Sequence, residues 1–175
     1  MLGIILDSPL CDPELYISTQ FNKRISTLPS FTQRLLQKLN DEKKFDLPLY
    51  KLLDKEISKH FVCRTIPLPQ LWYDSIDGMN DQIYRLMQGE SEFTIGGILK
   101  NWNCTNKLYL IQVPCFVIIG EYDTMTIECA SKIIENIPLA QKLCIIERAS
   151  HCKLLEEPKA VTSEIYCFLE TIPNK

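Results

Sequence analysis

Apolar residues along the chain fall into three short unbroken runs separated by segments with helical spacing. The runs cover residues 2–6, 113–119 and 143–146, and none of them alternates regularly between apolar and polar positions. A short apolar run without alternation is typical of a strand buried on both faces of a parallel sheet. We therefore expect three strands, one at the start of the chain and two after residue 100.

The long segment between the first two runs has apolar residues at helical spacing and no strand signal. A helix is predicted from Pro13 with Asp12 as its cap, and a second helix from the capping box at 30–33. Further amphipathic helices are predicted over 48–61 and 80–87. This segment should therefore be almost entirely helical.

The last two runs are each followed by a helical pattern. One helix should begin after Thr126 and the other at Pro158. The inward residues of the first are expected to be Ile127, Ala130, Ile133, Ile134 and Ile137, and those of the second Val161, Ile165, Phe168 and Leu169. Strands that alternate with helices in this way predict an α/β fold with a parallel sheet.

The composition is that of an ordinary globular domain, and it argues against two classes of partner, nucleic acids and membrane surfaces. It has 175 residues, 46% of them hydrophobic and 23% charged, and a formal charge of −3. A nucleic-acid or membrane-surface protein needs a concentrated basic face, so we expect neither partner. The apolar start lacks a basic stretch and is interrupted at Asp7, which argues against a signal peptide and favours a cytoplasmic location.

The eight cysteines do not form a metal-binding pattern. No C-x-x-C pair is present and the chain has only two histidines, whereas a zinc site assembled from short turns needs close pairs of ligands. Several cysteines stand inside apolar runs, where a free thiol behaves as a small hydrophobic group. We expect no metal and no cofactor, and eight reduced thiols in a reducing compartment.

Two polar residues follow successive predicted strands and could act together. Asp123 comes four residues after the run that ends at Ile119, and His151 comes five residues after the run that ends at Ile146. Taken singly, each is more often a loop or structural residue. In a parallel sheet, however, the carboxyl ends of the strands form the site, so an acid and an imidazole would meet there. Such a pair is the acid–base half of a nucleophilic triad.

No serine of the chain has the surroundings expected of the nucleophile. Ser91 lies in a sequence close to G-x-S-x-G, but the second glycine is replaced by Phe93 and no apolar strand precedes it. Ser150 directly precedes His151, and Ser8 follows a strand without flanking glycines. We therefore expect the attacking serine to lie outside this chain.

Several motifs, in this order, resemble those of the proline iminopeptidases, which are serine peptidases of the α/β-hydrolase fold with a helical cap. These motifs are Leu6-Asp-Ser-Pro-Leu10, His60-Phe-Val-Cys-Arg64, Ser91-Glu-Phe-Thr94, Leu99-Lys-Asn-Trp102, Val113-Pro114, Gly120-Glu-Tyr-Asp123 and Ser150-His151. The resemblance covers essentially the whole chain. It implies the last three parallel strands of the hydrolase sheet with a helical cap insertion. Residues 1–11 would hold the first strand, 12–100 the cap and 101–175 the C-terminal βαβα part of the core.

The resemblance also assigns roles to three residues. Asp123 would be the triad acid, His151 the triad base, and Glu92 the cap carboxylate that binds the free amino terminus of the substrate. Two positions depart from the family pattern: Thr124 stands where the family has an acid, and Ile127 stands where it has a proline. The missing acid weakens the expectation of proline release, because it would share the contact with the amine.

The resemblance therefore implies the C-terminal part of a serine aminopeptidase that releases an N-terminal residue, proline, from peptides. The expected partners are a peptide with a free N-terminus and either the missing N-terminal half of the core or another chain that covers the open strand edge. Alone, the chain should be inactive. Two alternatives remain open: a non-catalytic remnant or interaction module, and a hydrolase of esters or amides without a free amine.

Overall fold

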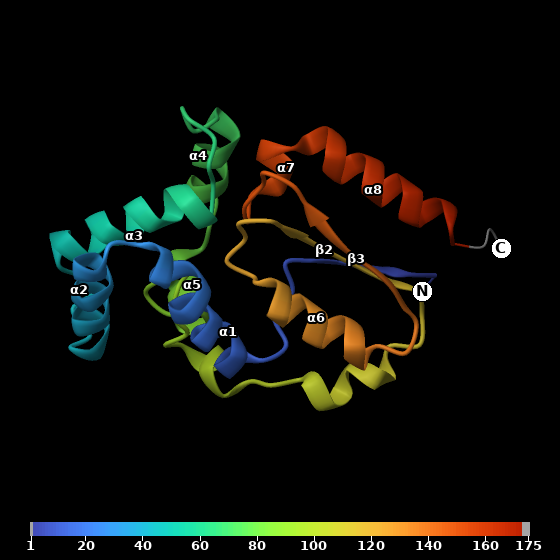
Figure 1. The fold of residues 1–175 in the computed structure, drawn as a ribbon, viewed down its shortest axis with the longest axis horizontal. Coiled ribbons are helices and arrows are strands. Elements are labelled where there is room, and N and C mark those ends of the chain that lie inside the picture. Colours follow the sequence, from blue (N-terminus) through green and yellow to red (C-terminus); the bar gives the residue numbers. More distant parts are fainter. Residues whose placement is uncertain (1, 173–175) are drawn as a thin grey trace.

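Three parallel strands form the centre of the molecule. The computed structural model describes residues 2–172, and its strands are β1 (Ile4–Asp7), β2 (Cys115–Gly120) and β3 (Ala140–Ile146). They lie in the order β1-β2-β3, so β2 is central and β1 forms one edge (Figure 1). The three predicted strands are confirmed. The third begins before residue 143, because the outer strand starts with half-exposed and exposed residues that an apolar run does not reveal.

Residues of β2 point alternately to the two faces of the sheet, and each face is covered by a helix. Val117 and Ile119 belong to a core shared with α6 (Ile127–Asn136), whereas Phe116 and Ile118 belong to a core shared with α8 (Pro158–Glu170). Figure 1 shows α6 and α8 on opposite sides of the sheet. Every residue of β2 is buried, as expected of a strand covered on both faces.

Two of the predicted inward residues point outward instead. Ile127 is the first residue of α6 and is exposed, while Cys129 takes a place in the buried face. Leu169 is exposed because its neighbour Phe168 takes the inward position, where it stacks on Phe116 with the ring centroids 5.3 Å apart. Adjacent residues of a helix are about 100° apart around the axis, so both cannot face the sheet.

The segment between β1 and β2 is helical, as predicted, and contains no strand among the residues that the structure describes. Its α-helices are α1 (Pro13–Thr19), α2 (Ser30–Asp41), α3 (Pro48–Phe61), α4 (Gln70–Asp77) and α5 (Asp81–Met87). A π-helical turn covers Gln20–Arg24, and 3₁₀ turns cover Ile25–Thr27, Ile98–Asn101 and Thr105–Leu110. The Asp12 side chain accepts a hydrogen bond from the Leu15 N–H at 3.1 Å, which confirms it as the cap of α1.

The predicted capping box at 30–33 is wrong. Pro29 occupies the N-cap position and Ser30 is already the first residue of α2. The side-chain amide of Gln33 donates instead to the carbonyl oxygens of Ser26 and Leu28, at 3.0 and 2.7 Å. Gln33 therefore secures the turn that precedes the helix.

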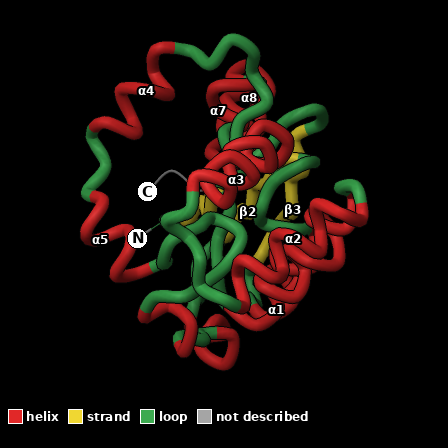
Figure 2. Tube along the Cα trace, turned by 90° about the vertical axis from the view of Figure 1, so that its left-hand side faces the viewer, coloured by secondary structure: helices red, strands yellow, loops and turns green. Residues whose placement is uncertain are grey.

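Helix α4 was not predicted, and it buries none of its residues. Leu71 and Ile76, for example, are both exposed. Helix α5 buries none of its residues either. Figure 2 shows α4 and α5 on an arc of chain that stands away from the remaining helices.

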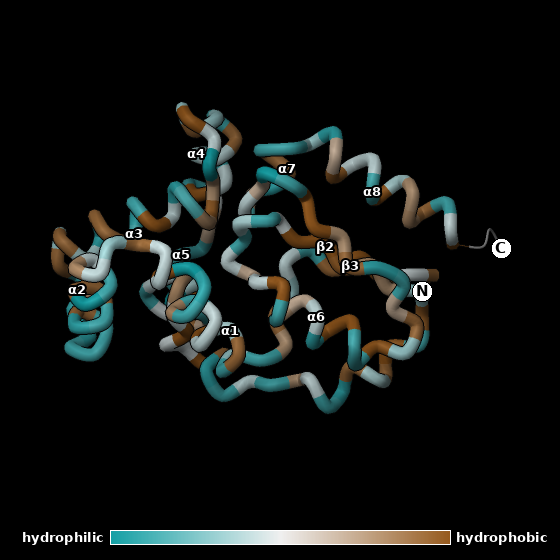
Figure 3. Tube along the Cα trace, viewed as in Figure 1, coloured by the Kyte–Doolittle hydropathy of each residue, from teal (hydrophilic) through white to brown (hydrophobic). Residues whose placement is uncertain are grey.

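The helical insert has its own apolar core and is tied directly to the loop after β3. Its core residues include Leu36 on α2, Ile57 and Phe61 on α3, and Phe93. At the end of α3, the carbonyl oxygens of Phe61 and Val62 accept hydrogen bonds from the backbone N–H groups of residues 151 and 152, at 3.2 and 2.8 Å. Figure 3 shows apolar residues along β2 and mainly hydrophilic residues along the lower part of α2.

The eight cysteines all lie within the described residues and are free thiols there. Five of them are buried, which agrees with a packing role. Among residues 2–172 no helix has the length and apolar character needed to cross a membrane.

Candidate active site

Two loops at the carboxyl ends of β2 and β3 bring Asp123 and His151 together. The β2 strand ends at Gly120, directly against the loop that carries His151. A Cβ atom at Gly120 would lie 2.3 Å from the carbonyl oxygen of Ser150, so only glycine allows the two loops to approach this closely. Asp123 follows three residues later, in the turn before α6.

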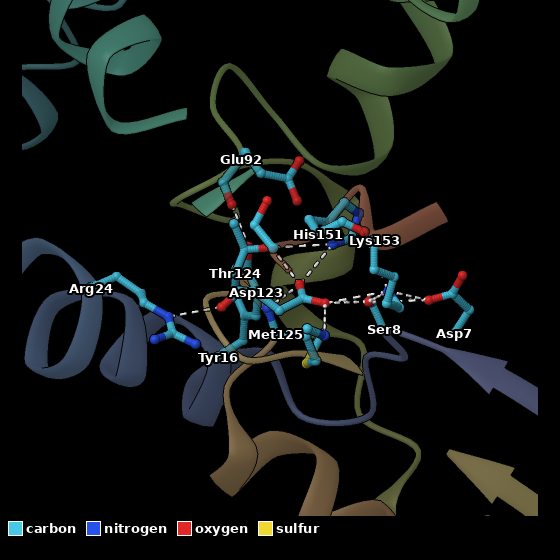
Figure 4. A network of polar contacts seen from close by, with 12 residues as sticks. Asp7, Ser8, Tyr16, Arg24, Glu92, Asp123, Thr124, Met125, His151 and Lys153 are labelled. Atoms are coloured by element: carbon cyan, nitrogen blue, oxygen red, sulfur yellow. Dashed lines mark hydrogen bonds and ion pairs between the residues drawn. The ribbon is translucent and has the colours of Figure 1, made fainter. Parts of the chain in front are cut away.

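The Asp123 carboxylate is directed at the ring of His151 (Figure 4). His151 Nδ1 lies 2.8 Å from Asp123 Oδ1, which also accepts a hydrogen bond from the backbone N–H of Met125 at 2.9 Å. The Asp123 side chain has no exposed surface, whereas the His151 side chain is 36% exposed. The structure therefore places a buried acid behind an imidazole that remains accessible.

The electrostatics of the pair favour an ionised acid and a more basic imidazole. Burial opposes ionisation of Asp123, but the hydrogen bond and charge of His151, together with Lys153 and Ser8, hold the pKa of its carboxyl well below the usual range. Burial also opposes protonation of His151, yet the hydrogen bond and charge of Asp123 and the charge of Glu92 raise the pKa of the imidazole.

Glu92 lies beside His151 (Figure 4) and is held by two tyrosines. Tyr84 on α5 donates its hydroxyl to Glu92 Oε2 at 2.8 Å, and Tyr16 on α1 donates to the Glu92 carbonyl oxygen at 2.5 Å. Burial raises the pKa of the Glu92 carboxyl, although His151 and the Tyr84 hydroxyl favour its ionised form. Neither tyrosine was predicted as a member of the site: Tyr16 lies 76 residues before Glu92, and Tyr84, eight residues before it, belongs to no motif that marks it.

Thr124 occupies the position directly after Asp123. Its hydroxyl lies 3.4 Å from Asp123 Oδ1 and 3.5 Å from His151 Nδ1. The Thr124 carbonyl oxygen accepts from the buried amide of Gln20 at 2.7 Å, and the Asp123 carbonyl oxygen accepts from Arg24 Nε at 2.8 Å. The π-helical turn of the insert thus fixes the backbone of this loop.

Two further residues contact Asp123 from behind and were not predicted as members of the site. Ser8 donates its hydroxyl to Asp123 Oδ2 at 2.6 Å, and Lys153 Nζ lies 3.4 Å from the same oxygen. The position of Ser8 after the first strand could have indicated this contact, because parallel strands end at the same edge of the sheet. Lys153 carries no comparable signal, since a lysine at the start of a helix is usually exposed.

The other two serines weighed as nucleophiles make structural contacts. Ser91 is buried and donates its hydroxyl to Asp54 Oδ1 at 2.6 Å. Ser150 is fully buried and donates to Glu156 Oε1 at 2.7 Å.

Comparison with solved structures defines the class of this fold. A hydrolase of the alpha/beta fold family from Bacillus anthracis aligns over 95% of this chain and 58% of its own with a TM-score of 0.55 at 18% identity. The three strands and their helices therefore have part of the α/β-hydrolase fold, with a partial sheet and a helical cap insertion, as predicted. No family model matches the chain.

Closer similarity is found to proline iminopeptidases. The structure of proline iminopeptidase from Mycobacterium smegmatis aligns with a TM-score of 0.85 at 25% identity, over 97% of this chain and 56% of that one. The structure of VinJ gives a TM-score of 0.88 at 25% identity, over 98% and 58%. Proline iminopeptidase from Heyndrickxia coagulans is 28% identical over 171 residues, 97% of this chain and 59% of its own length. That from Saccharolobus solfataricus is 27% identical over 171 residues, with 97% and 54% covered.

The chain is a homologue of the proline iminopeptidases along nearly all of its length, which confirms the resemblance seen in its motifs. It spans about half the length of the curated relatives that it matches.

Proposed function

We propose that the chain carries the acid and the base of a Ser-His-Asp triad in a serine aminopeptidase that releases N-terminal proline from peptides. The observation that carries this proposal is the 2.8 Å contact between His151 Nδ1 and Asp123 Oδ1, with the acid buried and the imidazole accessible. Homology to proline iminopeptidases along the chain supports the same reaction class.

The contact assigns distinct roles to the two ring nitrogens of His151. Because Nδ1 donates to Asp123, Nε2 is the nitrogen left to accept a proton from an attacking serine hydroxyl. The imidazolium formed in this step is stabilised by the Asp123 carboxylate. It then returns the proton to the leaving amine, and the acyl-enzyme is hydrolysed by the same sequence with water as the attacking group.

Glu92 is proposed to bind the positively charged amino terminus of the substrate. Its carboxylate is partly withdrawn from water, so an arriving ammonium group would favour its ionised form and gain a strong charge-assisted contact. The Tyr84 hydroxyl would hold Oε2 in place during binding. The proposal thus separates recognition by the cap residue Glu92 from proton transfer by His151.

The attacking serine is proposed to come from the rest of the hydrolase core, as a further segment or a separate chain. Strand β1 is an edge of the sheet and consists of the apolar residues Ile4, Ile5 and Leu6 followed by Asp7. An apolar edge strand invites pairing with another strand. In this arrangement residues 1–11 and 101–175 belong to the core and 12–100 to the cap.

A complementation experiment tests the proposal. The chain is co-expressed with, or fused to, the N-terminal part of the Heyndrickxia coagulans relative, and hydrolysis of proline p-nitroanilide is measured. We expect turnover only in the combined protein, and a loss on the order of 10⁴-fold for His151→Ala or Asp123→Asn. His60→Ala is the matched control, because this exposed histidine lies on α3 and should leave turnover unchanged.

Three results would contradict the proposal. Turnover by the isolated chain that depends on Asp123 and His151 would show that the serine need not come from elsewhere. Equal activity of the His151→Ala and His60→Ala proteins would remove the triad base. A folded combined protein without turnover of any ester or amide would favour a non-catalytic relative.

Thr124 favours a second candidate, a hydrolase of esters or amides without a free amine. Its neutral hydroxyl stands beside His151 where the family pattern has an acid, so Glu92 lacks a second carboxylate to share the amine. Comparison of free and N-acetylated proline p-nitroanilide separates the two activities. Glu92→Gln should impair turnover of the free-amine substrate alone if the aminopeptidase proposal is correct.

A further inference from the structure

The ammonium group of Lys153 is buried directly behind the candidate acid. The Lys153 side chain is 1% exposed, although lysine is rarely buried to this degree without a partner. Its Nζ lies 2.6 Å from Ser8 Oγ, 3.4 Å from Asp123 Oδ2 and 3.3 Å from the His151 carbonyl oxygen, and it forms an ion pair with Asp7. Figure 4 shows it on the opposite side of Asp123 from Thr124.

Lys153 joins two carboxylates that the topology brings to the same edge of the sheet. Asp7 ends β1 and pairs in register with Ile118 of β2, while Asp123 lies just beyond the end of β2. Two carboxylates at neighbouring strand ends repel each other. A cation between them offsets this repulsion, and the surrounding oxygens satisfy a charge that would otherwise be costly to bury.

The ammonium group of Lys153 also holds the backbone at the end of β1, through Ser8. Ser8 has a φ of 46°, a left-handed conformation that non-glycine residues adopt only where their surroundings hold them. Its hydroxyl accepts from Lys153 and donates to Asp123 Oδ2. Lys153, Ser8 and the backbone N–H of Gly120 therefore all engage Oδ2, whereas His151 and the N–H of Met125 engage Oδ1.

We propose that Lys153 is a positioning residue, whose ammonium group keeps Asp123 ionised and holds its Oδ2 so that Oδ1 remains directed at His151. The inference rests on the proposed function, in which Asp123 and His151 are the acid and base of a triad. It adds a third charged group to that pair, which acts on the imidazole through the carboxylate and not by contact with substrate.

The charges around His151 give this role a measurable consequence. Asp123 on the β2–α6 turn and Glu92 on the cap favour the imidazolium, while Lys153 on α7 (Lys153–Glu156) disfavours it. Asp7 pairs with Lys153, and Arg24 reaches the backbone of Asp123. Loss of the lysine charge should therefore make His151 more basic, whereas loss of the Asp123 charge should make it less basic.

The test is an NMR titration of the His151 ring in the full chain. Lys153→Met keeps the length and apolar stem of the side chain and removes its charge. We expect the proton-binding constant of the imidazole to rise about tenfold. Lys142→Met is the matched control, because Lys142 lies on β3 in an exposed ion pair with Glu164 and should leave the titration unchanged. Lys153→Arg keeps the positive charge, so the titration midpoint of the His151 ring should stay close to that of the unchanged protein.

The outcomes separate this inference from the proposed function. If Asp123→Asn lowers the His151 midpoint but Lys153→Met leaves it unchanged, the acid–base pair stands and the role of Lys153 is refuted. If Asp123→Asn has no effect, the pair itself is wrong.

Should Lys153→Met fail to fold, Asp7→Asn tests the same link, because the Asp7 side chain is 47% exposed and tolerates change. The ammonium group then acts on Asp123 without a competing anion, and the His151 midpoint should fall. An unchanged midpoint would overturn the inference.

Discussion

Glu156 offers the sharpest test of how the histidine loop is held. Its carboxylate accepts hydrogen bonds from the backbone N–H and the hydroxyl of Ser150, the residue before His151. It also accepts from the backbone N–H of Arg64, which follows the last turn of α3. One side chain therefore ties the loop after β3 to the helical insert, and Glu156→Ala should loosen both.

The expected cost follows from the burial of these partners. Ser150 is fully buried, so its N–H and hydroxyl would lose partners that water does not readily replace. A buried polar group left without a partner costs about 1–3 kcal/mol, and the Arg64 N–H lies in an exposed contact where water can take over. We therefore expect Glu156→Ala to lower the free energy of unfolding by about 2–4 kcal/mol.

Urea denaturation of the chain measures this loss, with the neighbouring Glu157→Ala as the control. Glu157 pairs at 3.4 Å with Arg148, whose side chain is 80% exposed, so its removal should cost about 0.5 kcal/mol or less. Equal midpoints for the two variants would refute the assignment of Glu156. Adding Ser150→Ala to the Glu156→Ala protein should recover part of the lost unfolding free energy, because it removes the Ser150 hydroxyl that Glu156→Ala leaves without a partner.

Three other changes probe the sheet and the acid–base pair. Gly120→Ala would press a Cβ against the carbonyl oxygen of Ser150, and should cost about 1–3 kcal/mol and displace the ring signals of His151 in NMR spectra. Phe116→Ala empties a fully buried site and should cost about 3–5 kcal/mol by urea denaturation. The lowered pKa of Asp123 gives stability that is lost as pH falls below about 4, and the raised pKa of His151 gives stability that is lost as pH rises above about 6.5. Asp123→Asn should flatten both dependences, and unchanged curves would contradict the ion pair.

Local sequence pattern predicted the strands and most helices, and most of these elements bury an apolar face, although α5 was predicted and buries none of its residues. The unbroken apolar character of residues 113–119 predicted a central strand, and β2 is buried throughout. Pattern failed where two adjacent apolar residues compete for one inward position, as at Phe168 and Leu169. It also missed α4, which buries none of its residues. The capping box at 30–33 failed because Gln33 bonds to the preceding turn instead of the N-cap.

The part of the candidate site that follows from the order of the strands could be predicted. Parallel strands place Asp123 and His151 at the same edge, and the motif resemblance adds Glu92. Side chains from distant helices, such as Tyr16, which lies 76 residues before Glu92, leave no local signal, because their contacts depend on how the insert packs. Lys153 is the clearest case, since a residue type usually exposed is here 1% exposed among oxygen atoms.

The contacts of the His151 loop argue that the helical insert and the sheet fold as one unit. The insert supplies carbonyl oxygens of Phe61 and Val62 to the N–H groups of His151 and Cys152, and receives the Glu156 carboxylate at Arg64. Removal of the insert would leave these buried or half-buried N–H groups without partners and the imidazole without its backbone support. The proposed boundary near residue 100 therefore does not divide the chain into two parts that would each be stable alone. The geometry of the acid and base depends on the insert, as does the proposed recognition of substrate by Glu92.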